Sequence, residues 1–286
     1  MWSLDGVLRY VPMAALHDGK TYLVEKYRNT IFNSASKARL NTANKQKWTV
    51  LGLGVSEQRT ESGKTFLALD GAKRELQTII KQTDSQTGIL NGAIKLDADF
   101  TSDAMFDALA FDKNPVVHIA SHFSYQVADF NESFLLLGKG KLSVKDLSAK
   151  STLFSNVDLL TLSACETAVG GANGKDVEGF AYLAQSLGAK AVMATLWQVD
   201  DIGTQVLMPE FYRLHETGLN KSESLRQAQI ALLQGKIKDA PTDLKRAELF
   251  GTETAKVELP KYVIDKNKPF AHPYYWSPFV LIGNWK

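Results

Sequence analysis

Cys165 and His122 are the two side chains whose types and positions favour covalent chemistry. Cys165 is the single cysteine of the chain, and it ends an apolar run that begins at Val157. His122 ends a second apolar run, which begins at Pro115. A thiolate is a strong nucleophile, and a neighbouring imidazole promotes ionisation of the thiol and protonates a leaving amine. This pairing favours a thiol peptidase.

The elements that must position these two residues alternate between strands and helices. Buried strands are predicted from the continuously apolar runs at 48–55, 115–122, 157–165 and 189–199. Helices are predicted at 72–81, 102–111, 177–187, 201–217 and 222–234, with Thr101 or Ser102 and Asn220 or Ser222 as caps. Alternation of this kind indicates a mainly parallel sheet with helices on both faces.

The topology of such a sheet bears on function. Open α/β sheets place ligands beyond the carboxyl ends of their strands, and both His122 and Cys165 fall at such ends. The two side chains would meet if their strands are neighbours, as consecutive strands usually are.

The chain is predicted to form a single domain over residues 1–286. Residues 1–45 are expected to be a lead-in of short extended pieces, including 6–12 and 22–25, and 46–235 the catalytic α/β core. A polar connection is expected at 123–156 within that core. The mixed charges of 236–270 predict a surface insertion, and 271–286 is expected to contain the final strand.

Composition excludes several classes of function. The chain has 33 basic and 31 acidic residues, and a net charge of +2 is too small to predict a nucleic-acid or membrane partner. No stretch approaches the ~20 apolar residues of a spanning helix. One cysteine cannot form an intrachain disulfide, which favours the cytoplasm. A lone cysteine with dispersed histidines predicts neither a metal site nor a cofactor.

Other interpretations of the same residues are simpler. A lone cysteine at a strand end is often a small buried hydrophobe. His118 is expected to lie in the core or behind the site, and the remaining histidines on loops or helix surfaces. Two glycine-containing segments fail as nucleotide motifs, because Gln58 and Glu57 stand where a phosphate loop and a dinucleotide fold need glycine.

Several segments together resemble a known family. Residues 163–168 resemble the cysteine motif of CHAT domains, caspase-like modules often fused to tetratricopeptide repeats, and 118–123 are similar to their histidine motif. The likeness continues in further segments, at 5–16, 188–201, 211–212, 225–229 and 276–279. It therefore extends over nearly the whole chain outside 236–270.

The resemblance implies a caspase-like three-layer sandwich that cleaves protein substrates. It implies that Cys165 is the nucleophile, that His122 is the general acid–base, and that the backbone N–H groups of Cys165 and Phe123 form the oxyanion hole. Caspases have glycine after the histidine, whereas this chain has Phe123. A backbone amide acts whatever its side chain, and the Phe123 ring is an alternative candidate for the rim of the substrate groove.

Substrate preference is expected to depend on three further residues. Ser163 takes the place that lines the specificity pocket in caspase-like peptidases, and it is small and neutral. Asp200 and Asp201 lie in a segment similar to one of separase in which an acidic residue helps to bind arginine, which would favour cleavage after a basic residue. An aspartate after a strand is equally well explained as a helix N-cap.

Three functions remain open at this stage. The first is a regulated cysteine endopeptidase, the second a catalytically silent signalling scaffold of the same fold, and the third a small-molecule-binding α/β domain. The intact histidine–cysteine pair favours the first. Because Met1 enters what looks like an early turn of the CHAT module, the chain is expected to be an excised domain or to have a late start, and its regulator is expected to be a tetratricopeptide-type repeat domain, in cis or in trans.

Overall fold

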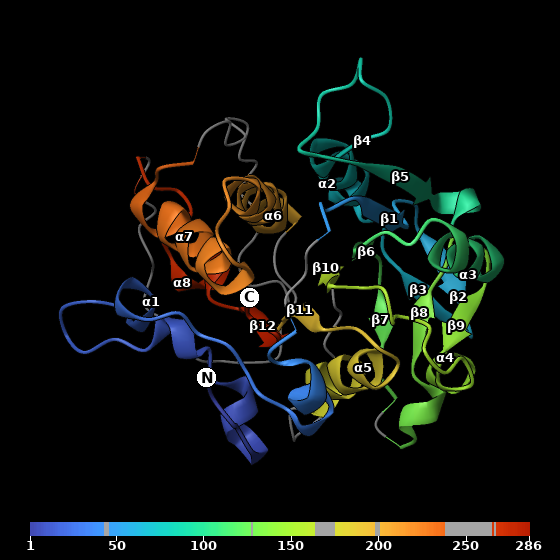
Figure 1. Ribbon diagram of the computed structural model, residues 1–286, viewed down its shortest axis with the longest axis horizontal. Helices are drawn as coiled ribbons and strands as arrows, with labels where there is room; N and C mark the ends of the chain where they lie inside the picture. Colours follow the sequence, from blue (N-terminus) through green and yellow to red (C-terminus); the bar gives the residue numbers. More distant parts are fainter. Residues whose placement is uncertain (43–45, 127, 164–174, 198–200, 238–264, 266) are drawn as a thin grey trace.

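A computed structural model of the protein (Figure 1) describes residues 1–42, 46–126, 128–163, 175–197, 201–237, 265 and 267–286. Side-chain surroundings are described for the same residues except 175–178 and 201–202.

A seven-stranded, mainly parallel sheet forms the centre of the molecule. Its order is β12 (Phe279–Gly283), β11 (Ala191–Thr195), β10 (Leu159–Ser163), β6 (Val116–Ala120), β1 (Val50–Gly54), β5 (Leu90–Leu96) and β4 (Ile80–Lys81). All neighbouring pairs are parallel except β11 with β12. Strands β1, β6, β10 and β11 are buried along their whole length, as their continuous apolar runs predict.

Helices cover both faces of this sheet (Figure 1). One face carries α3 (Ser102–Phe111), α4 (Val144–Ser148) and α5 (Lys175–Ser186); the other carries α1 (Leu23–Lys26), α2 (Asp70–Ile79), α6 (Asp201–Glu216), α7 (Lys221–Gln234) and α8 (Pro273–Trp276). Thr101 caps α3 through the Ala104 N–H and Asn220 caps α7 through the Glu223 N–H. The predicted three-layer α/β architecture and its main helices are confirmed.

Three segments differ from their predictions. Residues 6–12 and 22–25 were expected to be extended, but they contain the 3-10 helix η1 (Gly6–Tyr10) and α1. The Asp5 carboxylate caps η1, and the Glu25 carboxylate accepts from the N–H of Tyr22, the residue before α1; these local bonds override the strand-like composition. In the final segment, the expected strand is shorter, because Pro273 begins α8 and only β12 is extended.

The polar connection at 123–156 has structure of its own. It contains a three-stranded antiparallel sheet, formed by β7 (Phe123–Ser124), β8 (Phe134–Leu136) and β9 (Lys141–Ser143), and helix α4. A second small sheet pairs β2 (Arg59–Glu61) with β3 (Lys64–Phe66). Three further 3-10 helices are η2 (Met13–Ala15), η3 (Ser34–Arg39) and η4 (Asp97–Asp99), and η5 (Phe130–Glu132) precedes β8. The strands of the two small sheets are too short to show a period in the sequence.

Two glycines on β1 let α2 lie close against the sheet. A Cβ at Gly52 would come within 2.5 Å of Ile80 Cδ1, and one at Gly54 within 2.8 Å of Leu76 Cδ1. The missing side chains therefore leave room for Leu76, which is fully buried. This contact fixes the distance of α2 from the central strands.

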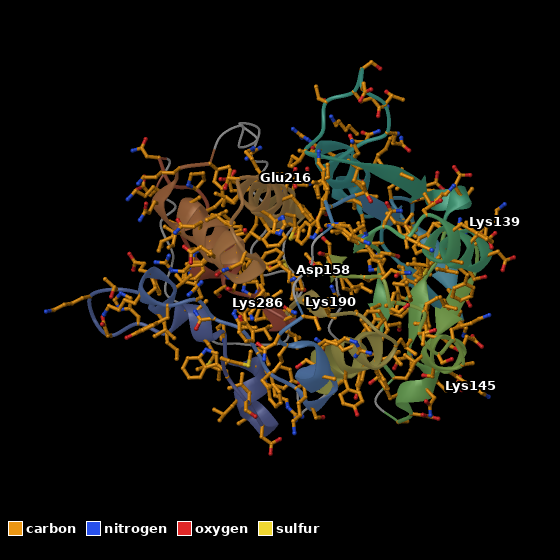
Figure 2. All side chains as sticks on the ribbon, viewed as in Figure 1. Lys139, Lys145, Asp158, Lys190, Glu216 and Lys286 are labelled. Carbon is orange, nitrogen blue, oxygen red and sulfur yellow. The ribbon has the colours of Figure 1, made fainter. Side chains whose placement is uncertain are left out.

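A buried ion pair ties α7 to the amino-terminal end of β10. The Asp158 carboxylate accepts hydrogen bonds from Lys221 Nζ at 3.0 Å and from Trp48 Nε1 at 3.1 Å. Lys190 Nζ lies 3.6 Å from the other carboxylate oxygen, as the adjacent labels in Figure 2 indicate. Lys221 has no solvent-exposed surface, and its burial lowers the pKa of its ammonium group. Asp158 is therefore the partner that makes a buried cation tolerable.

His215 makes the stability of the fold sensitive to acid. Its ring stacks on Trp48 with the ring centroids 3.4 Å apart. Burial, together with the nearby Lys221 charge, lowers the pKa of His215 to about 4, although the Asp158 charge raises it. Below its ordinary pKa of 6.5 the unfolded chain therefore binds the proton more readily. We expect the free energy of unfolding to fall between pH 6.5 and 4, by about 1.4 kcal/mol per pH unit from this group.

Urea titrations of wild type and His215→Phe at pH 7, 6, 5 and 4 measure this effect. Phenylalanine keeps the aromatic stack but has no proton to bind. The variant should lose roughly 3 kcal/mol less than wild type between pH 7 and pH 4. Parallel curves for the two proteins would show that His215 does not cause the acid sensitivity.

Candidate active site

The strands that lead to His122 and Cys165 are hydrogen-bonded neighbours. β6 and β10 are parallel and in register, so that their last residues, Ala120 and Ser163, lie side by side. His122 and Cys165 each follow two residues later in the sequence. Cys165 itself lies outside the described residues. The expectation that their strands are adjacent is confirmed.

A backbone carbonyl holds the imidazole of His122. Nε2 of His122 lies 2.8 Å from the carbonyl oxygen of Leu67, in the link between β3 and α2. A carbonyl oxygen only accepts hydrogen bonds, so Nε2 carries the hydrogen and Nδ1 is the basic nitrogen. The ring also packs 5.4 Å from the ring of Phe66, and His122 is only 4% exposed. Its tautomer and orientation are therefore set before any substrate binds.

Phe123 lies in the core, and the suggestion that its ring shapes a groove rim is wrong. The ring packs edge-on against Phe180 at 4.9 Å and is 4% exposed. The apolar core under α5 attracts a large ring more strongly than the surface does. The Leu136 N–H donates to the His122 carbonyl at 2.9 Å, which makes Phe123 and Leu135 a pair without direct hydrogen bonds. The backbone N–H of Phe123 consequently points away from β8.

Ser163 is buried and bonded to a carboxylate. Its hydroxyl donates to both carboxylate oxygens of Glu75, at 3.0 and 3.1 Å, and its exposure is 1%. Glu75 belongs to α2 and also lies 3.0 Å from Nε2 of His118, which is fully buried as expected. The neutral side chain of Ser163 is therefore in direct contact with an acidic group, which its residue type alone does not indicate.

The acidic residues proposed for specificity have less structural detail. Asp200 lies outside the described residues, and Asp201 is the first residue of α6 with a side chain that is not described. The other histidines lie apart from His122: His17 and His272 are in loops, and His215 is on α6. Among the described residues, no three side chains of histidine, cysteine, aspartate or glutamate gather as a metal site. No helix in the described ranges is long and apolar enough to cross a membrane.

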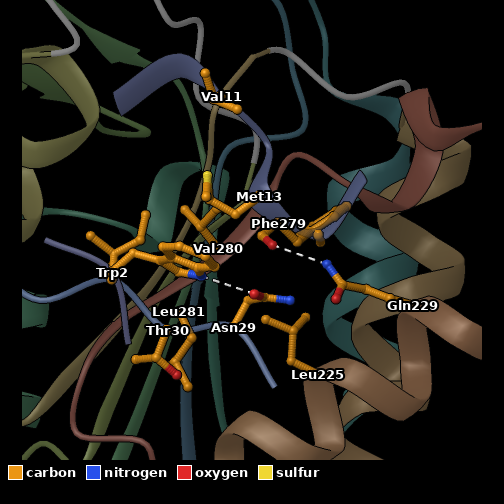
Figure 3. Close-up of a pocket in the computed structure, with 12 residues that line it drawn as sticks. Trp2, Val11, Met13, Asn29, Thr30, Leu225, Gln229, Phe279, Val280 and Leu281 are labelled. Atoms are coloured by element: carbon orange, nitrogen blue, oxygen red, sulfur yellow. Dashed lines mark hydrogen bonds between the residues drawn. The ribbon is translucent and has the colours of Figure 1, made fainter. Parts of the chain in front are cut away.

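Two hollows in the structure lie away from these residues. The first, shown in Figure 3, lies beside β12 and is crossed by the bonds of Trp2 to Asn29 and of Gln229 to the Phe279 carbonyl. Its volume of about 20 Å³ suits a single water molecule. The second is an open groove of about 490 Å³ beside α3 and the 149–156 segment. Neither includes His122 or Ser163 among its described lining residues.

Sequence patterns did not identify Leu67 or Glu75. Leu67 acts through its backbone carbonyl, which every residue type possesses, so no signal could have found it. Glu75 does carry a signal, because it lies at helical spacing with the apolar residues Ala72 and Ile79. A carboxylate within the buried stripe of a helix indicates a specific partner.

The family of the chain follows from comparison with family models. The model of the CHAT domain matches residues 1–284. The chain belongs to the CHAT domain family. Together with the mainly parallel sheet and its two helical layers, this assignment confirms the caspase-like fold that the sequence motifs implied. No curated protein sequence matches this CHAT domain.

Solved structures include proteins of similar architecture. One is the Arg-specific cysteine proteinase gingipain R, which is 10% identical with a TM-score of 0.45. The likeness covers 83% of the CHAT domain and 46% of the gingipain chain. The CHAT domain thus spans less than half the length of that structure.

Proposed function

We propose that this CHAT domain is a cysteine endopeptidase in which Cys165 is the nucleophile and His122 the general acid–base. The observation that carries the proposal is the bond from His122 Nε2 to the Leu67 carbonyl, beside the strand that leads to Cys165. This bond orients the ring and makes Nε2 the donor, so that Nδ1 is the nitrogen proposed to exchange protons with the thiol and the substrate.

In the proposed reaction, Nδ1 of His122 first takes the proton of the Cys165 thiol, and the resulting thiolate attacks the carbonyl carbon of a peptide bond. A carbon–sulfur bond forms, and the electron pair of the carbonyl moves to its oxygen. The N–H groups of Cys165 and Phe123 are proposed to bind this oxyanion, and the Phe123 N–H already points away from its neighbour strand. As the oxyanion collapses, Nδ1 of His122 gives its proton to the leaving amine and the carbon–nitrogen bond breaks.

The second half of the reaction releases the acyl group from sulfur. Nδ1, now unprotonated, takes a proton from a water molecule whose oxygen attacks the thioester carbon. The carbon–sulfur bond then breaks, and the carboxylic acid and the thiol are formed. Throughout, Nε2 keeps its proton and its hydrogen bond to the Leu67 carbonyl, so that the ring does not rotate between the two proton transfers.

Preference for a basic residue before the cleaved bond is proposed from acidic groups near the site. Asp200 and Asp201 follow β11, the strand next to β10. Negative charge at the end of these strands attracts a cationic side chain. Ser163 is small, neutral and bonded to Glu75, so the proposed preference rests on Asp200 and Asp201.

A peptide-library digest with wild type and Cys165→Ala tests the proposed function. Wild type is expected to cut a subset of peptides, mostly after lysine or arginine, and Cys165→Ala to cut none. Cleavage after other residues would remove the role proposed for Asp200 and Asp201. Equal cleavage by both proteins, or none by wild type, would favour a catalytically silent module.

A further inference from the structure

Glu75 is the centre of a buried polar network beneath the candidate site. Its carboxylate accepts from the Ser163 hydroxyl on β10 and from Nε2 of His118 on β6, each at 3.0 Å. Nδ1 of His118 lies 3.0 Å from the hydroxyl of Tyr212, which is also 3.0 Å from Thr161 Oγ1. All five side chains are less than 5% exposed.

The hydrogen bonds of this network can all be satisfied together. When a neutral His118 donates to Glu75 through Nε2, its Nδ1 accepts from Tyr212 and Tyr212 accepts from Thr161. Burial raises the pKa of Tyr212, so its hydroxyl remains a donor. The network is therefore fully satisfied and joins α2, β6, β10 and α6 by direct bonds.

The bonds of Glu75 reach the last residue of β10 and the middle of β6. Ser163 is the last residue of β10 and lies two residues before Cys165. His118 lies four residues before His122 on the neighbouring chain segment. The same helix follows Leu67, whose carbonyl holds His122, with α2 beginning at Asp70. One helix thus contacts the segments that lead to both members of the proposed dyad.

A carboxylate is a costly choice for this position if packing is its only role. Glu75 lies on the buried stripe of α2 with Ala72, Leu76 and Ile79. Replacing buried charged groups by apolar ones of similar size is often neutral or stabilising. A hydrogen-bonded carboxylate instead fixes the position of α2 relative to the two strands, which an apolar contact defines less narrowly.

We propose that Glu75 is a positioning residue for the dyad, tying the last residue of β10 and the middle of β6 to α2 so that the segments leading to Cys165 and His122 keep a fixed relative placement. This inference rests on the proposed function. Loss of the carboxylate would let Ser163, and with it the chain entering Cys165, shift relative to His122. A misplacement of about 1 Å is enough to reduce a reaction rate about a hundredfold.

The test uses the fact that Cys165 is the chain's single cysteine. The rate of its alkylation by iodoacetamide at pH 6 is measured for the folded protein and for the same protein in urea. The alkylation ratio is the rate in the folded protein divided by the rate in urea. Peptide cleavage supplies kcat and KM. The variants are Glu75→Ala, Glu75→Gln and Ile79→Ala, the last removing a fully buried side chain at the far end of α2.

Glu75→Ala should lower kcat about tenfold or more, change KM less than about twofold, and bring the alkylation ratio toward one. Glu75→Gln should keep most of the wild-type kcat and alkylation ratio, because its amide can accept from His118 and donate to Ser163. Ile79→Ala should lose stability while keeping kcat and the ratio. If Glu75→Ala does not fold, Ser163→Ala, which removes one hydroxyl, should show the same direction of change.

Two results overturn this inference alone: Glu75→Ala, or Ser163→Ala in its place, keeps the wild-type kcat and ratio, or Ile79→Ala loses as much kcat as Glu75→Ala. A wild-type ratio at or below one is a different failure. It would overturn the proposed function, and the positioning role with it.

Discussion

Replacing His122 with alanine is expected to slow peptide cleavage between about a hundredfold and ten-thousandfold. Without the imidazole, the thiol has no base to accept its proton and the leaving amine has no acid to protonate it. In the proposed mechanism Nδ1 of His122 carries the proton, because Nε2 is bonded to the Leu67 carbonyl. Initial rates on a peptide identified by the library digest measure the loss.

A matched control for this prediction is His17→Ala, because His17 is an exposed loop histidine apart from the site. It should cleave at the wild-type rate. Urea titration should also show that both variants are folded, since a fall in rate caused by unfolding would be uninformative. If folded His122→Ala retains more than half of the wild-type rate, His122 is not the general acid–base.

Replacing Asp158 with alanine is expected to cost about 3–5 kcal/mol of the free energy of unfolding. The substitution leaves the ammonium group of Lys221 buried without its anion, and it also removes the acceptor of Trp48 Nε1. Because stability of a domain is commonly about 5–15 kcal/mol, a loss of this size leaves little reserve. Guanidinium titration of wild type and variant at pH 7 measures it.

The double variant Asp158→Leu/Lys221→Met separates a buried pair from an unpaired charge. With neither charge present, its stability should return to within about 2 kcal/mol of wild type, although Trp48 still lacks its acceptor. The alkylation ratio of Cys165 should remain unchanged, because Asp158 lies just before β10 and Ser163 is at the strand's other end. A loss below about 1 kcal/mol in Asp158→Ala would show that the ion pair contributes little.

The central sheet and the adjacency of the strands that lead to His122 and Cys165 were predictable because both depend on strong patterns. Four continuously apolar runs separated by helical periodicity leave little alternative to a parallel sheet covered on both faces. Adjacent placement of β6 and β10 follows from the preference of consecutive strands to be neighbours, and it brings the segments of His122 and Cys165 to one edge.

Elements governed by local bonds or by distant partners were less predictable. Residues 6–12 have strand-like composition, yet the Asp5 cap produces a 3-10 helix there. Phe123 follows a histidine in a polar-looking connection, but its ring is drawn into the core against Phe180. The Leu67 carbonyl bond depends on a loop conformation and on no side chain. Such features arise from tertiary contacts that a local pattern does not record.

The alkylation rate of Cys165 tests the central claim most directly. At pH 6 an ordinary thiol is only about 0.3% ionised, so a thiol activated by an imidazole should react about tenfold faster in the folded protein than in urea. The His122→Ala variant should lose that advantage. A thiol that only packs the core would instead react more slowly when folded, and that result in wild type would contradict the proposal that Cys165 is a nucleophile.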